Sequence, residues 1–402
     1  MRRLLLIVAC LLASSQVLAK KVDLDYQVRL LPQSGQAEVR LTLADGSVVR
    51  SLDFDLGKGG AYSDFLADGQ WQAQNGRGVW RPAPGKTSLS YRVLLDQQPR
   101  STTHETRITP HWALFRGEQL VPPARLDQQD GTELVARLAF DLPKGWKSVE
   151  TAWPRISRQK FRIDDVSRLF DRPTGWMLAG NLGSRRARLG ETEVTVAAPQ
   201  GQGMRRMDTL TLLTFIWPQL QAVFPRNPNK LLVVGARDEM WRGALPGYNS
   251  LYLHSTSPLI SESGNSPLLR ELVQLFAQIN DRDASDWLGE SFTDYYATEL
   301  LRRAGGLSDD RYATLQARLH KRAAKVSHLN GDKADAAQVA RGVLLLQALD
   351  REIRLHNHDK RSLDDVARAL MRLSSVNTEE FVQISENVLG RPSEVLQSKV
   401  LR

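Results

Sequence analysis

The sequence predicts an α+β protein in which an N-terminal antiparallel β-sandwich, residues 20–190, precedes a second domain, residues 191–402, that is helical from about residue 266. Apolar residues alternate with period two through most of the first region, which is typical of half-buried strands. Helical patterns follow one another from about residue 266 almost to the end. The first 19 residues differ from both regions and have the pattern of an export signal.

The export signal is predicted over residues 1–19. Arg2 and Arg3 precede an apolar run over residues 4–13, and small residues flank Leu18 at the expected cleavage site. A run this short cannot cross a bilayer core of about 30 Å, and no later segment is long and apolar enough. We therefore expect an exported, soluble protein with no transmembrane segment. Lipidation at Cys10 is the less favoured alternative, because only nine residues precede it.

Cysteine content and charge restrict the chemistry of the mature chain. Cys10 is the only cysteine, so cleavage of the signal excludes disulfides, a thiolate nucleophile and a cysteine metal site. Loss of Arg2 and Arg3 lowers the formal net charge from +9 to +7. This mild basicity favours anionic surfaces, and in an exported protein it argues against nucleic acid as a partner. The periplasm is the expected location, with the extracellular space as the alternative.

Strand patterns in the first region are clearest over residues 22–30, 39–43, 89–93 and 134–140. Asp45-Gly46 and Asn75-Gly76 are expected to form tight hairpin turns, in which both central residues need positive φ. Nothing in this region concentrates reactive side chains. It is interpreted as a scaffold or a substrate-positioning domain.

Helix signals dominate the second region. Asp208 is expected to cap a helix that Pro218 kinks, and residues 231–234 are expected to form a buried strand. Capping and terminating residues, among them Ser362, Gly305 and Gly390, support a series of helices. These helices are predicted at 267–280, 286–303, 308–327, 335–356, 362–373 and 378–388.

Two neighbouring helical segments carry the informative pattern: LLRELVQ at residues 268–274 and DWLGESFTDYY at residues 286–296. They resemble the two helices that define gluzincin metallopeptidases, H-E-x-x-H and W-x-x-E-G-x-[TA]-x-Y-Y. Two histidines four residues apart on a helix point the same way, so they can share one zinc ion. The resemblance implies a third ligand from the second-helix glutamate, a zinc-bound water and a first-helix glutamate acting as general base.

Two of the three zinc-ligand positions are substituted in this chain. Arg270 stands at the first histidine position and Gln274 at the second, whereas Glu271 and Glu290 match the glutamates of the pattern. Arginine is a permanent cation without a lone pair to offer, and glutamine offers only a weak carbonyl oxygen. We therefore predict no metal cofactor, although zinc is expected in the family, and we interpret Glu271 as a vestigial general base.

Further segments, at residues 241–254, 257–260, 300–306, 342–354 and 362–366, resemble bacterial members of the glycyl aminopeptidase (M61) family. The resemblance covers roughly residues 130–402 and implies a thermolysin-like fold for the second domain. It also implies a tyrosine that stabilises the tetrahedral intermediate, at a position where Val339 supplies no hydroxyl. An inherited cleft is expected along an edge strand near residues 247–253, with Tyr248, Asn249 and Tyr295 lining it.

The substitutions predict an exported pseudopeptidase that binds a peptide or protein in the inherited cleft without cleaving it. Three alternatives stay open: an active aminopeptidase-like hydrolase with an atypical metal site, a structural periplasmic protein, and an unrelated helical domain. We expect the guanidinium of Arg270 to pair with Glu290 in bidentate fashion near the vacated zinc position. The remaining histidines, such as His111, His254, His320 and His328, are expected on the surface or satisfied in the core.

Overall fold

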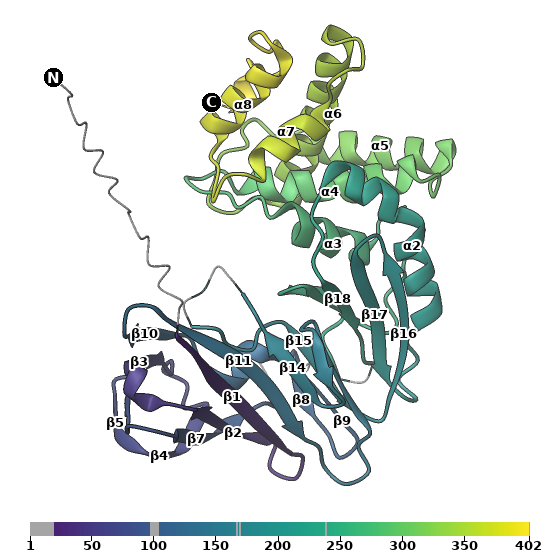
Figure 1. Ribbon diagram of the computed structural model, residues 1–402. Helices are drawn as coiled ribbons and strands as arrows, with labels where there is room; N and C mark the ends of the chain where they lie inside the picture. Colours follow the sequence, from purple (N-terminus) through teal and green to yellow (C-terminus); the bar gives the residue numbers. More distant parts are fainter. Residues whose placement is uncertain (1–19, 97–103, 166–167, 169, 238, 402) are drawn as a thin grey trace, which may run out of the picture.

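The computed structural model describes residues 20–96, 104–165, 168, 170–237 and 239–401. The N-terminal β-sheets lie at one end of the molecule and the C-terminal helical region lies at the other (Figure 1). The predicted signal peptide and Cys10 lie outside the described residues. The α+β class is confirmed, with antiparallel sheets first and a helical region after them. No helix among the residues described is long and apolar enough to cross a membrane.

The first part of the chain forms a seven-stranded and a four-stranded sheet that share one apolar core. Alternate residues of the first strand, from Val22 to Leu30, are at most 4% exposed, as the period-two pattern predicts. The larger sheet has the order β13 (Arg155–Ser157), β14 (Lys160–Ile163), β11 (Thr132–Asp141), β1 (Lys20–Leu31), β2 (Gln36–Leu43), β7 (Thr87–Leu94) and β4 (Tyr62–Ala67). The smaller sheet has the order β10 (Ala124–Gln128), β3 (Val49–Asp55), β6 (Arg77–Pro82) and β5 (Gly69–Gln74). One pair departs from the antiparallel pattern, because β1 and β11 run parallel.

One predicted hairpin turn is confirmed and the other is wrong. Asn75 and Gly76 join the paired strands β5 and β6 with φ values of 52° and 75°. Asp45 instead caps a short 3-10 helix, η1 (Gly46–Val48), by accepting a hydrogen bond from the backbone N–H of Ser47. This turn leads the chain from β2 in one sheet to β3 in the other, so it joins no pair of neighbouring strands.

A third sheet lies between the N-terminal core and the rest of the molecule. Its order is β12 (Ser148–Thr151), β15 (Trp176–Gly180), β9 (Trp112–Arg116) and β8 (Arg107–Ile108), and the short helix α1 (Gly117–Leu120) follows β9. One face, including Phe115 and Met177, enters the N-terminal core. The other face, including Leu114 and Trp176, packs with residues of the next sheet in a separate cluster. The third sheet therefore packs on both faces, against the N-terminal core on one and against the next sheet on the other.

The five-stranded sheet that follows has the order β16 (Leu182–Leu189), β17 (Thr192–Pro199), β18 (Lys230–Val234), β20 (Ser250–Leu253) and β19 (Ala244–Gly247). The predicted division at residue 190 falls in the turn between β16 and β17, which pair along their whole length. Helix α2 (Arg206–Val223) packs on this sheet and contains Pro218. Asp208 does not cap it, because α2 begins two residues earlier and Asp208 lies in its first turn.

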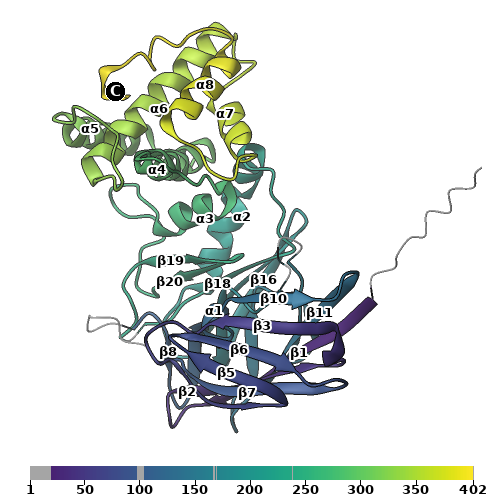
Figure 2. The same ribbon diagram turned by 90° about the vertical axis from the view of Figure 1, so that its left-hand side faces the viewer.

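The helical region closely follows the predicted positions. It comprises α3 (Pro267–Ala277), α4 (Asp286–Arg303), α5 (Asp309–Ala323), α6 (Ala336–His356), α7 (Leu363–Leu370) and α8 (Thr378–Leu389), with the 3-10 turn η2 (Lys399–Leu401) at the end. Helix α3 lies between the edge strand β19 and helix α4 (Figure 2). This arrangement places the two segments with the peptidase-like pattern side by side and next to a sheet edge.

Candidate functional site

Helices α3 and α4 position the residues of the candidate site. Ser266 caps α3 by accepting a hydrogen bond from the N–H of Leu269 at 3.2 Å. The apolar face of α3, which includes Leu272 and Val273, is buried, so Arg270 and Glu271 are left facing the neighbouring elements. On α4, Glu290 and Asp294 are four residues apart and therefore lie on one face of the helix.

The guanidinium of Arg270 lies between the carboxylates of Glu290 and Asp294. Its Nη2 donates a hydrogen bond to Oε2 of Glu290, and its Nη1 donates one to Oδ1 of Asp294. The predicted pairing with Glu290 is confirmed. The predicted bidentate geometry is wrong, because the two ends of the guanidinium bind carboxylates one helical turn apart rather than a single one. Sequence reasoning missed Asp294, although its i+4 spacing from Glu290 is visible in the sequence.

Burial and the ion pairs together shift the pKa values of Arg270 and Asp294. Burial disfavours the charged guanidinium, but the nearby carboxylates of Asp294 and Glu290 outweigh it and raise the pKa of Arg270 above its ordinary value. Burial raises the pKa of Asp294 above its ordinary value, although Arg270 acts in the opposite direction. Arg270 thus favours the charged form of Asp294, which burial disfavours.

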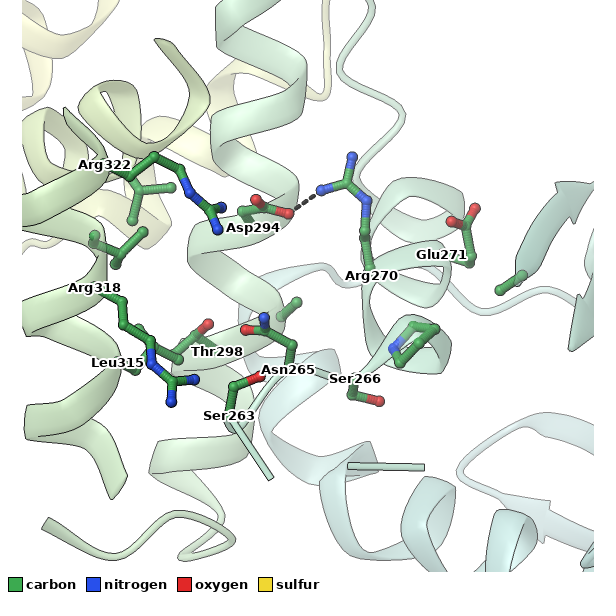
Figure 3. A pocket seen from close by; sticks show the side chains of 15 residues that line it. Ser263, Asn265, Ser266, Arg270, Glu271, Asp294, Thr298, Leu315, Arg318 and Arg322 are labelled. Atoms are coloured by element: carbon green, nitrogen blue, oxygen red, sulfur yellow. Dashed lines mark hydrogen bonds and ion pairs between the residues drawn. The ribbon is translucent and has the colours of Figure 1, made fainter. Parts of the chain in front are cut away.

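Glu271 points away from this ion pair, toward β19 (Figure 3). Its Oε2 is buried and has no hydrogen-bond partner among the described residues. Burial raises the pKa of Glu271 from 4.5 to about 7, with a smaller opposing effect of Arg270. Burial therefore favours the neutral form of the carboxyl group at the general-base position of the peptidase pattern.

A cavity of about 400 Å³ opens beside this site between α3, α4 and α5. We call it the arginine-lined cavity, because Arg270, Arg318 and Arg322 line it together with Glu271 and Asp294 (Figure 3). The two α5 arginines extend toward the cavity from the side opposite α3. Its wall also contains Ala244 of β19, so the cavity borders the edge of the five-stranded sheet.

The four positions of the peptidase pattern do not share one cavity. Arg270 and Glu271 line the arginine-lined cavity, whereas Gln274 and Glu290 line a second one of about 280 Å³. Glu290 nevertheless contacts the first site through its ion pair with Arg270. Val339 lies outside both cavities; it is buried in α6, and its carbonyl oxygen accepts a hydrogen bond from Ser291 at 3.3 Å.

None of the three residues predicted to line the cleft lines the arginine-lined cavity itself. Tyr248 and Asn249 form the turn between β19 and β20, and the ring of Tyr248 stacks on Trp153 with 4.9 Å between ring centroids. This stacking packs Tyr248 against the N-terminal core. Tyr295 is 5% exposed and borders a small pocket next to the arginine-lined cavity.

The residues at the site do not fit a zinc ion. The guanidinium of Arg270 occupies the space between the two carboxylates, where a metal would have to neutralise them. No group of three or more His, Cys, Asp or Glu residues could hold a metal in the part of the chain that the structure describes. The buried His254 is satisfied by the carbonyl oxygen of Arg237 at 2.7 Å, and His111, His320 and His328 are exposed.

Comparison with known proteins identifies the fold. No protein-family model and no curated protein sequence matches the chain. An aminopeptidase N family protein from Idiomarina loihiensis matches with a TM-score of 0.66 at 15% identity, over 93% of this chain and 78% of that one. Native leukotriene A4 hydrolase from Saccharomyces cerevisiae matches with a TM-score of 0.53 at 15% identity, over 94% of this chain and 66% of that one. The chain therefore has a gluzincin-type peptidase fold, and the similarity extends well before residue 130.

Proposed function

We propose that the chain is an exported pseudopeptidase, which binds a peptide or protein segment in a cleft inherited from a peptidase and does not cleave it. The observation that carries the proposal is the ion pair of Arg270 with Glu290 and Asp294. In the gluzincin pattern the first ligand and the second-helix glutamate converge on the zinc. Here an internal cation of the chain neutralises that glutamate.

The substitutions act together against hydrolysis. A zinc ion would have to displace the guanidinium and then rely on Glu290 and the exposed amide of Gln274, which is a poor ligand set for a metal that prefers nitrogen and sulfur donors. Without a metal, Glu271 has no activated water to deprotonate. The position of the expected tyrosine is held by Val339, which has no hydroxyl to stabilise an oxyanion.

Binding does not need the lost groups. Among the described residues, strand β19 is the edge of the five-stranded sheet and pairs with β20 alone. An extended peptide can pair with such an edge through backbone hydrogen bonds. Ala244 at the start of β19 also lines the arginine-lined cavity, so a peptide on this edge would reach the cavity. The predicted signal peptide would bring the protein to the periplasm or outside the cell. Assignment to the glycyl aminopeptidase family within the gluzincins remains part of this proposal.

The test uses the mature protein, residues 20–402, purified without chelator. Zinc content is measured by mass spectrometry, and a random peptide library is incubated with the protein in the presence and absence of a chelator. We expect substoichiometric zinc, retention of some peptides on the immobilised protein and no new peptide ends. Chelator-sensitive cleavage would refute the proposal in favour of an active hydrolase. Failure to retain any peptide would favour a purely structural role.

A further inference from the structure

Two arginines of the arginine-lined cavity form no ion pair with Glu290 or Asp294 within the described residues, although Arg322 lowers the pKa of Asp294 through its nearby charge. Arg318 and Arg322 are four residues apart on α5 and so lie on one face of that helix. Nearby arginines are engaged: Arg303 binds Glu299 and Asp364, and Arg311 donates a hydrogen bond to the carbonyl oxygen of Ser261. Arg318 and Arg322 are exposed and make no hydrogen bond or ion pair within the described residues.

The acidic residues of the cavity do not satisfy these two cations. The guanidinium of Arg322 points toward Asp294 (Figure 3), but Asp294 already accepts from Arg270. Glu271 lies on the far side of α3, toward β19. The neighbours of Arg318 on the cavity wall include the neutral side chains of Ser263 and Thr298. One anionic group could therefore bind between the two α5 arginines without displacing an existing ion pair.

The cavity also has an apolar wall next to these cations. Leu315 and Leu319 lie on α5 one turn before Arg318 and Arg322, and Val343 of α6 completes the surface. A volume of about 400 Å³ lies within the range of small-ligand sites. It suits one or two residues of a peptide, and not a folded domain. The cavity thus places an apolar surface one helical turn away from two guanidinium groups.

We propose that the arginine-lined cavity binds the C-terminal residue of a peptide that ends in an apolar amino acid. Arg318 and Arg322 hold the terminal carboxylate, and Leu315, Leu319 and Val343 contact the last side chain. Guanidinium groups match the planar carboxylate. A terminal residue carries its carboxylate and its side chain on the same carbon, which agrees with the one-turn separation. The proposal rests on the proposed function, because it names the ligand class of the same cleft.

The experiment measures binding of fluorescent peptide pools to the mature protein. Each pool has four randomised positions followed by leucine, and it is made with a free C-terminal carboxylate or with a C-terminal amide. We expect amidation to weaken binding about ten-fold or more, and Arg318→Gln and Arg322→Gln each to weaken binding of the free acid about ten-fold, since each removes a charged hydrogen bond. Lys321→Gln is the matched control, because it removes the same charge from an exposed α5 position that does not line the cavity.

The outcomes separate this inference from the proposed function. If amidation and the two arginine variants leave affinity within two-fold, the carboxylate site is refuted while non-catalytic peptide binding stands. If an amidated pool with glutamate as its penultimate residue binds as well as the free acid, the C-terminal assignment is wrong. Carboxylate-dependent binding followed by cleavage would refute the pseudopeptidase and leave the carboxylate site intact. No binding by any pool would refute both, provided that circular dichroism shows the protein to be folded.

Discussion

Replacement of Arg270 by methionine tests whether this side chain holds the α3–α4 contact together. The variant keeps much of the apolar stem and removes the cation between Glu290 and Asp294. The Arg270 side chain is 34% exposed, and the two carboxylates are 37% and 40% exposed. Exposed ion pairs contribute about 0.2–1 kcal/mol, whereas removal of one partner from a buried pair costs about 3–5 kcal/mol. For two half-buried pairs we expect a loss of about 2 kcal/mol.

The loss should depend on pH in a defined direction. Arg270 lowers the pKa values of Asp294 and Glu271, which burial raises. Without Arg270, the pKa values of Asp294 and Glu271 in the folded state rise further above their values in the unfolded chain. Between the unfolded and folded pKa values, the folded variant therefore binds more protons than the unfolded chain. Stability then falls as pH rises through the folded pKa values. Arg270→Met should therefore be more destabilising at pH 8 than at pH 5.

The assay is thermal unfolding followed by circular dichroism at 222 nm, which reports on the helices. A loss of about 2 kcal/mol corresponds to a decrease of about 4–8 °C for a domain of this size. Arg50→Met is the control, because Arg50 and Asp127 form an exposed pair with both side chains 58% accessible, and its expected effect is under about 0.5 kcal/mol. Unchanged stability of Arg270→Met at both pH values, or a larger loss at pH 5, would refute the reasoning.

Three further predictions concern single side chains. Burial raises the pKa of Glu271 from 4.5 to about 7, so the stability of the native protein should fall as pH rises through that interval. The variant Glu271→Gln should lack this pH dependence. In the same melts it should be up to about 3 kcal/mol more stable than the native protein above pH 7. A Cβ at Gly342 would lie 2.0 Å from Oγ of Ser291, so Gly342→Ala should separate α4 from α6 and cost about 2 kcal/mol, while Gly59→Ala, in open space, should be neutral. Glu150 is 3% exposed and pairs with Arg186 and Lys230 of the five-stranded sheet. Glu150→Gln should therefore cost about 3 kcal/mol and favour separate unfolding of the N-terminal sheets and the rest of the chain, measured by calorimetry.

Helices of this protein could be predicted well because their start and stop signals are local. Helix α4 has its predicted bounds, and α8 begins at the predicted residue behind the cap of Asn377. Strand pairing could not be predicted in the same way. Asp45 and Gly46 fit a tight hairpin, yet the carboxylate of Asp45 captures a neighbouring N–H and the chain crosses to another sheet. A turn motif fixes a few dihedral angles and does not select the strand that pairs next.

The part of the candidate site that depends on the spacing of residues along each helix could be predicted from the sequence. The match of the two helical segments to the peptidase pattern placed Arg270 next to Glu290, and the structure confirms that contact. The split of the guanidinium between two carboxylates depends on the crossing of α3 and α4, which no local pattern specifies. The approach of Arg318 to the cavity depends on how α5 packs on α4 and α6. In the sequence this segment is indistinguishable from a solvated basic face.

Anomalous diffraction at the zinc edge, from crystals of the mature protein grown with excess zinc, tests the central claim most directly. We predict no anomalous peak between α3 and α4, and electron density for the Arg270 guanidinium bridging Glu290 and Asp294. A zinc peak bound to Glu290, with Arg270 displaced from the two carboxylates, would contradict the account.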